Sequence, residues 1–504
     1  MIEETEPQLK VEEIVEIGTV VSVGDGTALV TGLKSVGSQE VVEFQNEVYG
    51  IAFTLSRDQV GCILLGPEER IQEGSPVKRT GRGLHVPVGE PLVGRIVNAL
   101  GQPIDGKGPI AAHAYRLMER KAPGVVRRQP VKEPLQTGIK ALDALVPLGR
   151  GQRELIIGDR KIGKTTIAID TILAQKGVGV ICVYVSIGQK ASSIARVVQV
   201  LRQAGAMEYT IVVAALPNEQ PSFRYLAPYA GCAIGEEFME KGKHALIVYD
   251  DLSKHAVTYR EMSALLKRPI GREAYPGDIF YIHSRLLERA AKLRDDLGGG
   301  SLTALPIVET LAGDISAFIP TNVVSICDGQ IFLDGGLFNE GFRPAIDAGL
   351  SVSRVGGAAQ TKAMKKVAGR LRIDMAQYQE MATFVKFGAE VDKATLAQLT
   401  RGERGRQLLV QDQHAPMSVE EETIVLYAAT KGYLDRVPLD LTAEFEQAFV
   451  AHVHERHPSM LEQLQETKEL SPALEHQLDT ALAAFGEQFA TGHPESEDVT
   501  PLVL

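Results

Sequence analysis

A glycine-rich stretch at residues 158–165 carries the strongest chemical signal in the sequence. It fits the pattern GxxxxGK[ST], directly follows the apolar run Leu155-Ile156-Ile157 and directly precedes a helical pattern. Such a loop lets backbone N–H groups surround phosphates at a helix N-terminus, where Lys164 would reach the β- and γ-phosphates and Thr165 would ligate Mg²⁺. We therefore predict a phosphate-binding loop. Its residues are Gly158, Asp159, Arg160, Lys161, Ile162, Gly163, Lys164 and Thr165.

An acidic pair follows a second apolar run. Residues 244–249 end in Asp250-Asp251, and an apolar strand that ends in an acid can hold Mg²⁺ through water. Because buried strands followed by a solvated aspartate are common, this pattern alone does not indicate a nucleotide site. It does so only together with the phosphate-binding loop at 158–165. Asp250 directly follows the apolar run and is the better candidate for a Mg²⁺ and nucleotide ligand.

Hydrolysis would need a residue that deprotonates the attacking water, usually a carboxylate at the end of the neighbouring strand. The strand expected over 180–185 is followed by Ser186-Ile187-Gly188-Gln189. Glutamine can hydrogen-bond to water but cannot act as a base. Gln189 therefore leaves a nucleotide site without an evident general base, although glutamine positions water in some GTPases, so slow turnover stays open.

One arginine, Arg354, stands in the Ser/Gly-rich segment Leu350-Ser351-Val352-Ser353-Arg354-Val355-Gly356-Gly357. A guanidinium there could serve the chain's own site or, as an arginine finger, stabilise transition-state charge in a neighbour's site. A plain surface arginine is the third interpretation of the same pattern.

The elements around these residues alternate between strand and helix. Apolar strands are expected at 154–157, 180–185, 210–216 and 245–249, with helices at 164–175, 192–204 and 223–241 between them. Continuous apolar strands that alternate with helices predict a parallel sheet covered on both faces.

Other patterns flank this central part. Short β-rich runs between residues 15 and 65, with the hairpin signal Asp25-Gly26, predict a small closed barrel. A Gly/Pro-rich connector follows over 81–108. From Thr361 onward apolar residues fall at helical spacing, and Ser471-Pro472 predicts an N-cap followed by proline at the first helical position. We predict domains at 14–83, 84–360 and 361–490, and a disordered acidic tail at 491–504.

Composition narrows the class of protein. The 504 residues hold 53 Lys and Arg against 64 Asp and Glu, and this net charge of −11 disfavours nucleic-acid binding. Four scattered cysteines without a CxxC pair suit a reducing compartment and argue against a zinc cluster. The start of the sequence is acidic, unlike a signal peptide, and no run approaches the ~18 apolar residues of a membrane span. We expect a cytoplasmic chain, or one held peripherally at a membrane by other subunits.

In their order and three-part organisation, these motifs resemble the alpha subunit of the F-type ATP synthase. The resemblance extends from about residue 16 to about residue 489 and rests on the stretches 94–106, 149–160, 249–254, 271–278 and 351–360. It implies a multidomain α/β fold with an N-terminal β-barrel, a central RecA-like P-loop domain and a C-terminal helical bundle.

The resemblance also implies a function. Each alpha subunit of the family binds MgATP at a non-catalytic, regulatory site in an α₃β₃ ring around the gamma/epsilon central stalk. Gln189 occupies the place of the beta subunit's catalytic glutamate, Arg354 resembles the arginine finger given to the adjacent beta site, and Ser351 matches a position needed for activity. The implied adenine pocket consists of Arg343, Pro344, Gln411 and Gln413. The implied machine makes ATP with a proton or sodium gradient, at the cytoplasmic face of the cell membrane.

Two departures from the family pattern stand out. The usual P-loop has Gln-Thr where this sequence has Lys161-Ile162, which adds a positive charge beside the phosphates and removes a hydroxyl. The segment before Val15 is shorter than the family helix that contacts the delta subunit and the peripheral stalk. The second departure suggests a divergent second ATP synthase and makes attachment through the b and delta subunits less secure.

Two alternative functions share related folds. A ring translocase that hydrolyses ATP itself, such as a termination helicase or an export ATPase, would need a basic channel or a glutamate at position 189. A non-catalytic subunit of a vacuolar or archaeal rotary ATPase is disfavoured because such subunits usually lack an intact P-loop, which this sequence has at Gly163-Lys164-Thr165.

Overall fold

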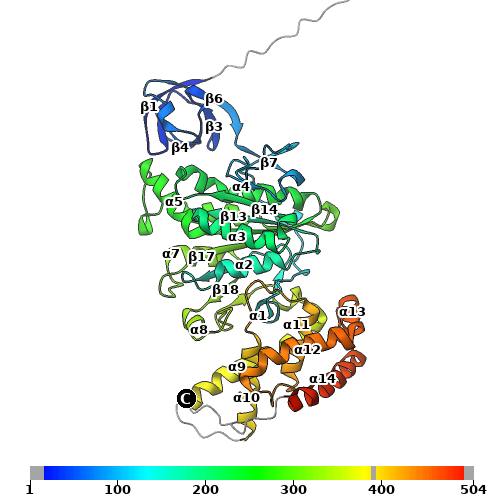
Figure 1. The fold of residues 1–504 in the computed structure, drawn as a ribbon. Coiled ribbons are helices and arrows are strands. Elements are labelled where there is room, and N and C mark those ends of the chain that lie inside the picture. The colour runs from blue at the N-terminus through cyan, green and yellow to red at the C-terminus, as the bar shows by residue number, and fades with distance from the viewer. Residues whose placement is uncertain (1–15, 387–392, 493–504) are drawn as a thin grey trace, which may run out of the picture.

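The computed structural model describes residues 16–386 and 393–492. Three parts follow one another along the long axis of the molecule: a β-barrel, a mixed α/β domain and a group of helices (Figure 1). The predicted fold class is confirmed. The segment before Val15 and residues 493–504 of the predicted acidic tail lie outside the described residues, whereas α14 extends to Gly492.

The N-terminal part is a closed barrel with the strand order β1-β2-β5-β4-β3-β6. Asp25 and Gly26 both have positive φ (52° and 72°), which gives the two-residue turn between β1 and β2 the backbone twist that a tight hairpin needs. Side chains such as Val30, Val42 and Cys62 fill the barrel. The strands are β1 (Ile17–Gly24), β2 (Thr27–Thr31), β3 (Glu40–Glu43), β4 (Tyr49–Leu55), β5 (Val60–Leu64) and β6 (Pro76–Gly83).

The segment expected as a connector over 81–108 contains strands. β7 (His85–Val88) pairs with β9 (Ala114–Leu117), and the two-residue β8 (Ile96–Val97) joins the edge of the central sheet beside β14. Because β8 is so short and glycines and prolines surround it, no alternation of apolar and polar residues could indicate it in advance.

The central sheet has the order β19-β18-β12-β17-β15-β13-β14-β8, with β16 paired to β17. All its pairings are parallel except those of β19 and β16, as the apolar strands predicted. Its strands are β12 (Leu155–Gly158), β13 (Val180–Ile187), β14 (Thr210–Ala215), β15 (His244–Asp250), β16 (Ala291–Lys292), β17 (Ser301–Glu309), β18 (Gly329–Leu333) and β19 (Val352–Ser353). A separate small pair joins β10 (Pro134–Leu135) to β11 (Leu148–Gly149).

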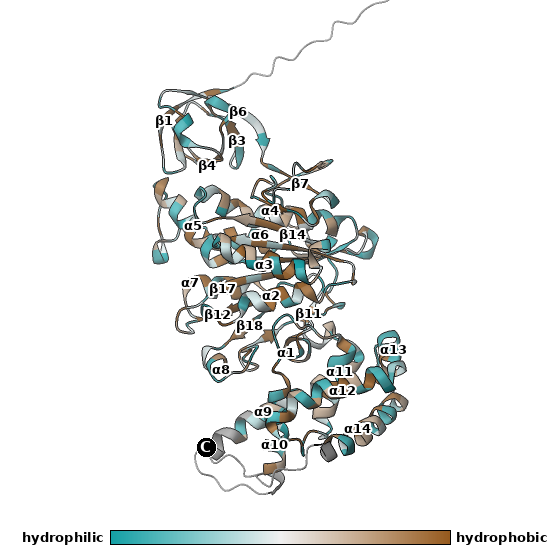
Figure 2. Cartoon of the chain, in the orientation of Figure 1, coloured by the Kyte–Doolittle hydropathy of each residue, from teal (hydrophilic) through white to brown (hydrophobic). Residues whose placement is uncertain are grey.

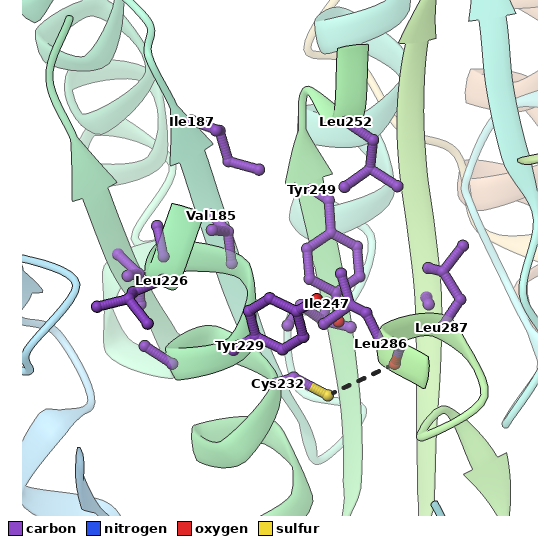
Figure 3. Packing of buried hydrophobic residues seen from close by; sticks show 14 of the residues in the cluster. Val185, Ile187, Leu226, Tyr229, Cys232, Ile247, Tyr249, Leu252, Leu286 and Leu287 are labelled. Atoms are coloured by element: carbon purple, nitrogen blue, oxygen red, sulfur yellow. Dashed lines mark hydrogen bonds between the residues drawn. The ribbon is translucent and has the colours of Figure 1, made fainter. Parts of the chain in front are cut away.

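Helices cover both faces of this sheet. Apolar residues of α2 (Lys164–Leu173) and α3 (Ala191–Gln203) pack on one face, in one cluster with Cys182 and Val248. On the other face, Tyr229 and Cys232 of α4 lie against Val185, Ile247 and Tyr249 (Figure 3). That face also contacts α5 (Leu252–Leu265), α6 (Ile279–Leu287) and α7 (Phe318–Ile326), beside α4 (Pro221–Glu240). Figure 2 shows the strands of this sheet as largely hydrophobic.

The C-terminal part is helical, as predicted. Met364, Val367 and Leu371 face a core shared with Leu478 and Leu482. The Oγ atom of Ser471 accepts a hydrogen bond from the backbone N–H of Leu474 at 3.2 Å, and this contact confirms the predicted cap. The helices are α9 (Lys362–Lys386), α10 (Lys393–Leu408), α11 (Val419–Thr430), α12 (Thr442–Arg456), α13 (Pro458–Thr467) and α14 (Pro472–Gly492). The short α1 (Lys140–Leu145) and α8 (Gly335–Asn339) lie between the sheet and these helices.

All four cysteines are free thiols and are buried. Burial raises the pKa of the Cys62 thiol to about 12, so this side chain behaves as a small apolar group in the barrel. In the part of the chain that the structure describes, no helix is long and apolar enough to cross a membrane.

Candidate functional site

The glycine-rich loop joins β12 to α2 at the carboxyl edge of the parallel sheet. Gly163 has φ of 104° and Gly158 has φ of 156°. A Cβ atom on Gly158 would lie 2.7 Å from the backbone oxygen of Leu333, so only glycine fits there. Within the described chain, the backbone N–H groups of residues 160–163 donate no hydrogen bond. They are therefore available to an anion at the N-terminus of α2.

Lys164 is the buried cation of this loop, with 6% of its surface exposed. Its Nζ atom donates to the backbone oxygen of Gly158 at 2.8 Å and also to that of Asp159. Burial lowers the pKa of Lys164, and the surrounding carboxylates, Glu309 first, oppose that shift. Two carbonyls thus hold the ammonium group across the loop, where it can meet the phosphates of a nucleotide.

Thr165, Asp250 and Gln189 come together in the structure. Thr165 Oγ1 donates to Asp250 Oδ2 at 2.9 Å, and Gln189 Nε2 donates to Asp250 Oδ1 at 2.9 Å. Tyr184 of β13 also donates, from its hydroxyl to Asp250 Oδ2 at 2.7 Å. A hydroxyl and a carboxylate at this spacing are the donor set that Mg²⁺ takes beside a nucleotide. The residues therefore fit a bound Mg²⁺.

The strand-end position that would carry a general base holds an amide instead. Gln189 follows β13, and its Nε2 donates a hydrogen bond to Asp250. Two carboxylates that line the same cavity are paired: Glu309 accepts from Arg160 Nε at 2.8 Å, and Asp170 lies 3.0 Å from His414 Nδ1. A third, Asp412, is exposed at the far end of the cavity.

A cavity of about 1090 Å³ extends from the loop to the predicted adenine pocket. Arg343, Pro344, Gln411 and Gln413 all line it. The peptide bond between Arg343 and Pro344 is cis, and the Arg343 guanidinium lies 4.7 Å above the Phe338 ring.

Gln411 differs from the other three because its amide is fully used. Its Oε1 accepts from the backbone N–H of Lys140 at 3.0 Å, and its Nε2 donates to the carbonyl oxygens of Gly138 at 2.7 Å and Ala415 at 2.9 Å. Gln411 therefore holds the wall of the cavity in place and has no free N–H for a base.

Arg354 and Ser351 lie apart from this cavity. Ser351 is buried, and its Oγ accepts from the backbone N–H of Phe332 in β18 at 2.9 Å. Arg354 is exposed, and its backbone N–H donates to the carbonyl oxygen of Asp328 at 2.8 Å. Among the residues that the structure describes, the Arg354 guanidinium has no hydrogen-bond or salt-bridge partner, whereas the nearby Arg153 binds Asp328 at 2.9 Å.

Several cavity residues were absent from the sequence prediction. Glu309 had a signal, because it ends the apolar strand β17 just as Asp250 ends β15. Tyr184 had none, since a tyrosine inside an apolar strand is indistinguishable from an ordinary core residue. Further cavity-lining residues that the sequence prediction did not name include Lys190, Ser193, Arg196, Pro217 and Phe338.

Fold and site together define a class. A phosphate-binding loop and a strand-end aspartate meet at the carboxyl edge of a parallel sheet, beside a cavity large enough for a nucleotide, so this is a P-loop nucleotide-binding protein. Three family models match the chain: ATP synthase alpha/beta family, beta-barrel domain, at residues 14–81; the nucleotide-binding domain of that family at 138–353; and the ATP synthase alpha/beta chain, C terminal domain, at 360–485.

A curated relative covers nearly the whole chain. ATP synthase subunit alpha of Aquifex aeolicus (strain VF5) is 58% identical over 488 residues, which are 97% of this chain and 96% of the relative. The chain belongs to the ATP synthase alpha-subunit family and is thus part of the ATP synthase enzyme complex.

Proposed function

We propose that this chain is the regulatory, non-catalytic MgATP-binding subunit of an F-type ATP synthase, which makes ATP from ADP and phosphate with a transmembrane proton or sodium gradient. The observation that carries the proposal is the contact between Gln189 Nε2 and Asp250 Oδ1 at 2.9 Å. It supports a site that binds Mg-nucleotide but has an amide where the base for hydrolysis would act.

In this proposal each polar group of the cavity has a binding role. Backbone N–H groups of residues 160–163 and the Lys164 ammonium bind the phosphates. Thr165 and Asp250 hold Mg²⁺, which neutralises phosphate charge when bound. Arg343, Pro344 and Gln413 face the base, and Gln411 keeps that wall in position through the backbone of Lys140.

Arg354 acts outside the chain's own site. Its exposed guanidinium and its separation from the cavity support a contact with the catalytic site of an adjacent beta subunit in an alternating α₃β₃ ring. Such an arginine stabilises charge on the transferring phosphoryl group. Ser351, held on Phe332 in β18, fixes the start of the segment that carries Arg354.

The remaining partners follow from the same proposal. The helical domain contacts the gamma/epsilon central stalk and the beta neighbours. The peripheral stalk attaches through its b subunit, with delta as a further candidate. The chain is held peripherally at the cytoplasmic face of the cell membrane by the membrane-sector subunits, which carry the ion.

Binding and turnover of the purified chain test the central point. We expect the full-length chain alone to bind MgATP without steady hydrolysis, and Lys164→Ala to bind it about 10- to 100-fold more weakly. Steady hydrolysis by the chain alone would contradict the proposal and support a self-hydrolysing ring translocase. In that case Glu309→Gln would show whether Glu309, the carboxylate beside Arg160, supplies the base.

A further inference from the structure

Two carboxyl groups meet where the nucleotide-binding domain contacts the C-terminal helices. Asp143 belongs to α1 and is 6% exposed, and Glu422 belongs to α11 and is completely buried. Their carboxyl groups are in hydrogen-bonding contact. Two carboxylates cannot hydrogen-bond to each other unless one of them carries a proton.

The hydrogen bonds around the pair indicate which group is ionised. Asp143 accepts from the backbone N–H of Thr137 at 3.0 Å, from Thr137 Oγ1 at 2.8 Å and from the backbone N–H of Gly138 at 3.1 Å. Burial raises the pKa of Asp143 to about 6, and these donors oppose that rise and favour the carboxylate form. Neither oxygen of Glu422 accepts a hydrogen bond from an N–H or O–H group in the described chain. Glu422 can satisfy its buried carboxyl group only by donating to Asp143.

We propose that Glu422 is a protonated positioning residue whose O–H group donates to Asp143 and thereby fixes the turn at residues 137–140 that supports the adenine end of the nucleotide cavity. Glu422 touches no nucleotide in this proposal, and its effect passes through Asp143. The proposal rests on the proposed binding of nucleotide in that cavity.

The turn connects directly to the cavity wall. The carbonyl oxygen of Gly138 accepts from Gln411 Nε2 at 2.7 Å and from the backbone N–H of Met417 at 3.0 Å. The backbone N–H of Lys140 donates to Gln411 Oε1 at 3.0 Å, and Ile139 lines the cavity. A displacement of Asp143 would therefore move the backbone that holds Gln411.

Other charged groups surround the pair. On α1, Lys140 is buried, and Glu446 of α12 lies 2.6 Å from its Nζ. The charge of Lys140 also interacts with Glu422, whose pKa it lowers, and with Asp412. On α11, Glu421 is occupied by Ser418 and His454. From α9, Arg372 binds the carbonyl oxygens of Ala144 and Leu145. Among the described residues, Lys140 is thus the cation that acts on Glu422, and its charge is compensated mainly by Glu446.

The expected pH dependence follows from these contacts. Burial, and next the Asp143 carboxylate, raise the pKa of Glu422 well above its ordinary value. A glutamate that is protonated when folded and ionised when unfolded stabilises the protein most at low pH, and this contribution is lost as pH rises toward the folded-state pKa. Ionisation of Glu422 would place two carboxylates in one buried contact and loosen the turn.

The rate of MgATP release from the full-length chain, followed with fluorescent ATP from about pH 7 to about pH 10, above the pKa of Asp143, tests this role. We expect release from the wild type to accelerate by about tenfold at alkaline pH. Glu422→Gln keeps an N–H donor for Asp143 but cannot ionise, so its release should stay slow and independent of pH. The matched control is Glu420→Gln, which removes a half-buried carboxylate from the same helix turn and should follow the wild type.

A second readout requires no nucleotide and separates this proposal from the proposed function. Between the unfolded and folded pKa values of Glu422, the free energy of unfolding of the wild type should fall as pH rises. Relative to Glu422→Gln, the slope should correspond to the release of about one proton on unfolding. If Glu422→Gln does not fold, Glu422→Met should also lack this slope. Equal pH profiles for wild type and variant would overturn the proposal. If Glu422→Gln lost the pH dependence of stability but the wild type bound no nucleotide, the proton shared by Glu422 and Asp143 would be supported. The proposed nucleotide site would then be contradicted.

Discussion

The nucleotide cavity and the Arg354 segment use arginine and lysine in opposite ways. In the cavity, Lys164 donates to two backbone carbonyls and Arg160 pairs with Glu309 at 2.8 Å. On the Arg354 side, Arg153 is bound to Asp328, but the exposed Arg354 guanidinium has no hydrogen-bond or salt-bridge partner in the described chain. The backbone of Arg354 is nevertheless fixed on Asp328.

This difference indicates where each charge acts. A cation held by groups of its own chain is preorganised for a ligand in that chain's cavity. A cation on a fixed backbone, with a free head group and 430 Å³ of open space beside it, is suited to a partner from outside. The two regions therefore support binding within the chain and a contribution to chemistry in a neighbour.

Removal of the Arg354 guanidinium should give the largest effect. In a ring reconstituted with beta subunits, we expect Arg354→Ala to lower steady-state ATP turnover by about 10³-fold or more, because an arginine finger stabilises transition-state charge on this scale. MgATP binding to the isolated variant chain should stay within a factor of about two.

The control for this variant is Arg57→Ala, which removes another exposed arginine, from the turn between β4 and β5. Its turnover should match that of the wild type. Full turnover by Arg354→Ala, or loss of nucleotide binding to the isolated variant, would contradict the inference that Arg354 acts in a neighbouring site rather than in the chain's own cavity.

Loss of the buried lysine should have the next largest effect, and on binding alone. Lys164→Ala removes a charge-assisted contact with phosphate, so we expect a dissociation constant for MgATP that is weaker by about 10- to 100-fold. Equilibrium dialysis of the isolated chain measures it, with Lys176→Ala, an exposed residue just beyond the C-terminal end of α2, as the control. An unchanged constant would show that nucleotide binds elsewhere.

Much of the fold could be predicted because its strands are buried on both faces. The runs at 180–185 and 210–216 became β13 and β14, longer or shorter by one or two residues. β8 could not be predicted, because a two-residue strand has no periodicity and forms only where β14 offers a free edge. The barrel was predictable because short β-rich runs follow one another and Asp25-Gly26 is typical of the tight turn in its first hairpin.

The site was predictable where residue types and spacing are tied to backbone geometry. Lys164, Thr165 and Asp250 belong to such patterns, and the structure places them together. Two contacts required the tertiary structure. The Tyr184 hydroxyl reaches Asp250 across neighbouring strands, and Gln411 binds the backbone at Gly138, which lies far away in the sequence.

The P-loop itself offers a smaller test through Ile162, which is 7% exposed and packs in the cluster that contains Ile156 and Leu333. Ile162→Thr removes one buried methyl group and replaces a buried methylene group by a hydroxyl. We expect the free energy of unfolding to fall by about 1–2 kcal/mol, as measured by urea denaturation. A free energy of unfolding equal to that of the wild type would mean that the packing of Ile162 does not stabilise the loop. Ile162→Val is the control: it removes one methylene group without burying a hydroxyl, and should lower the free energy of unfolding by less than Ile162→Thr does.

The neighbouring Lys161 should have the smallest effect, because its side chain is exposed and adds only a screened charge near the phosphates. Its φ of 65° is one that glutamine would share, so Lys161→Gln leaves the backbone strain unchanged. We expect MgATP to bind about two- to fivefold more weakly at low salt, with the difference vanishing near about 0.5 M salt. Lys176→Gln should show no change at either salt concentration. A loss above about tenfold that persists at high salt would mean that Lys161 binds phosphate directly and belongs with Lys164.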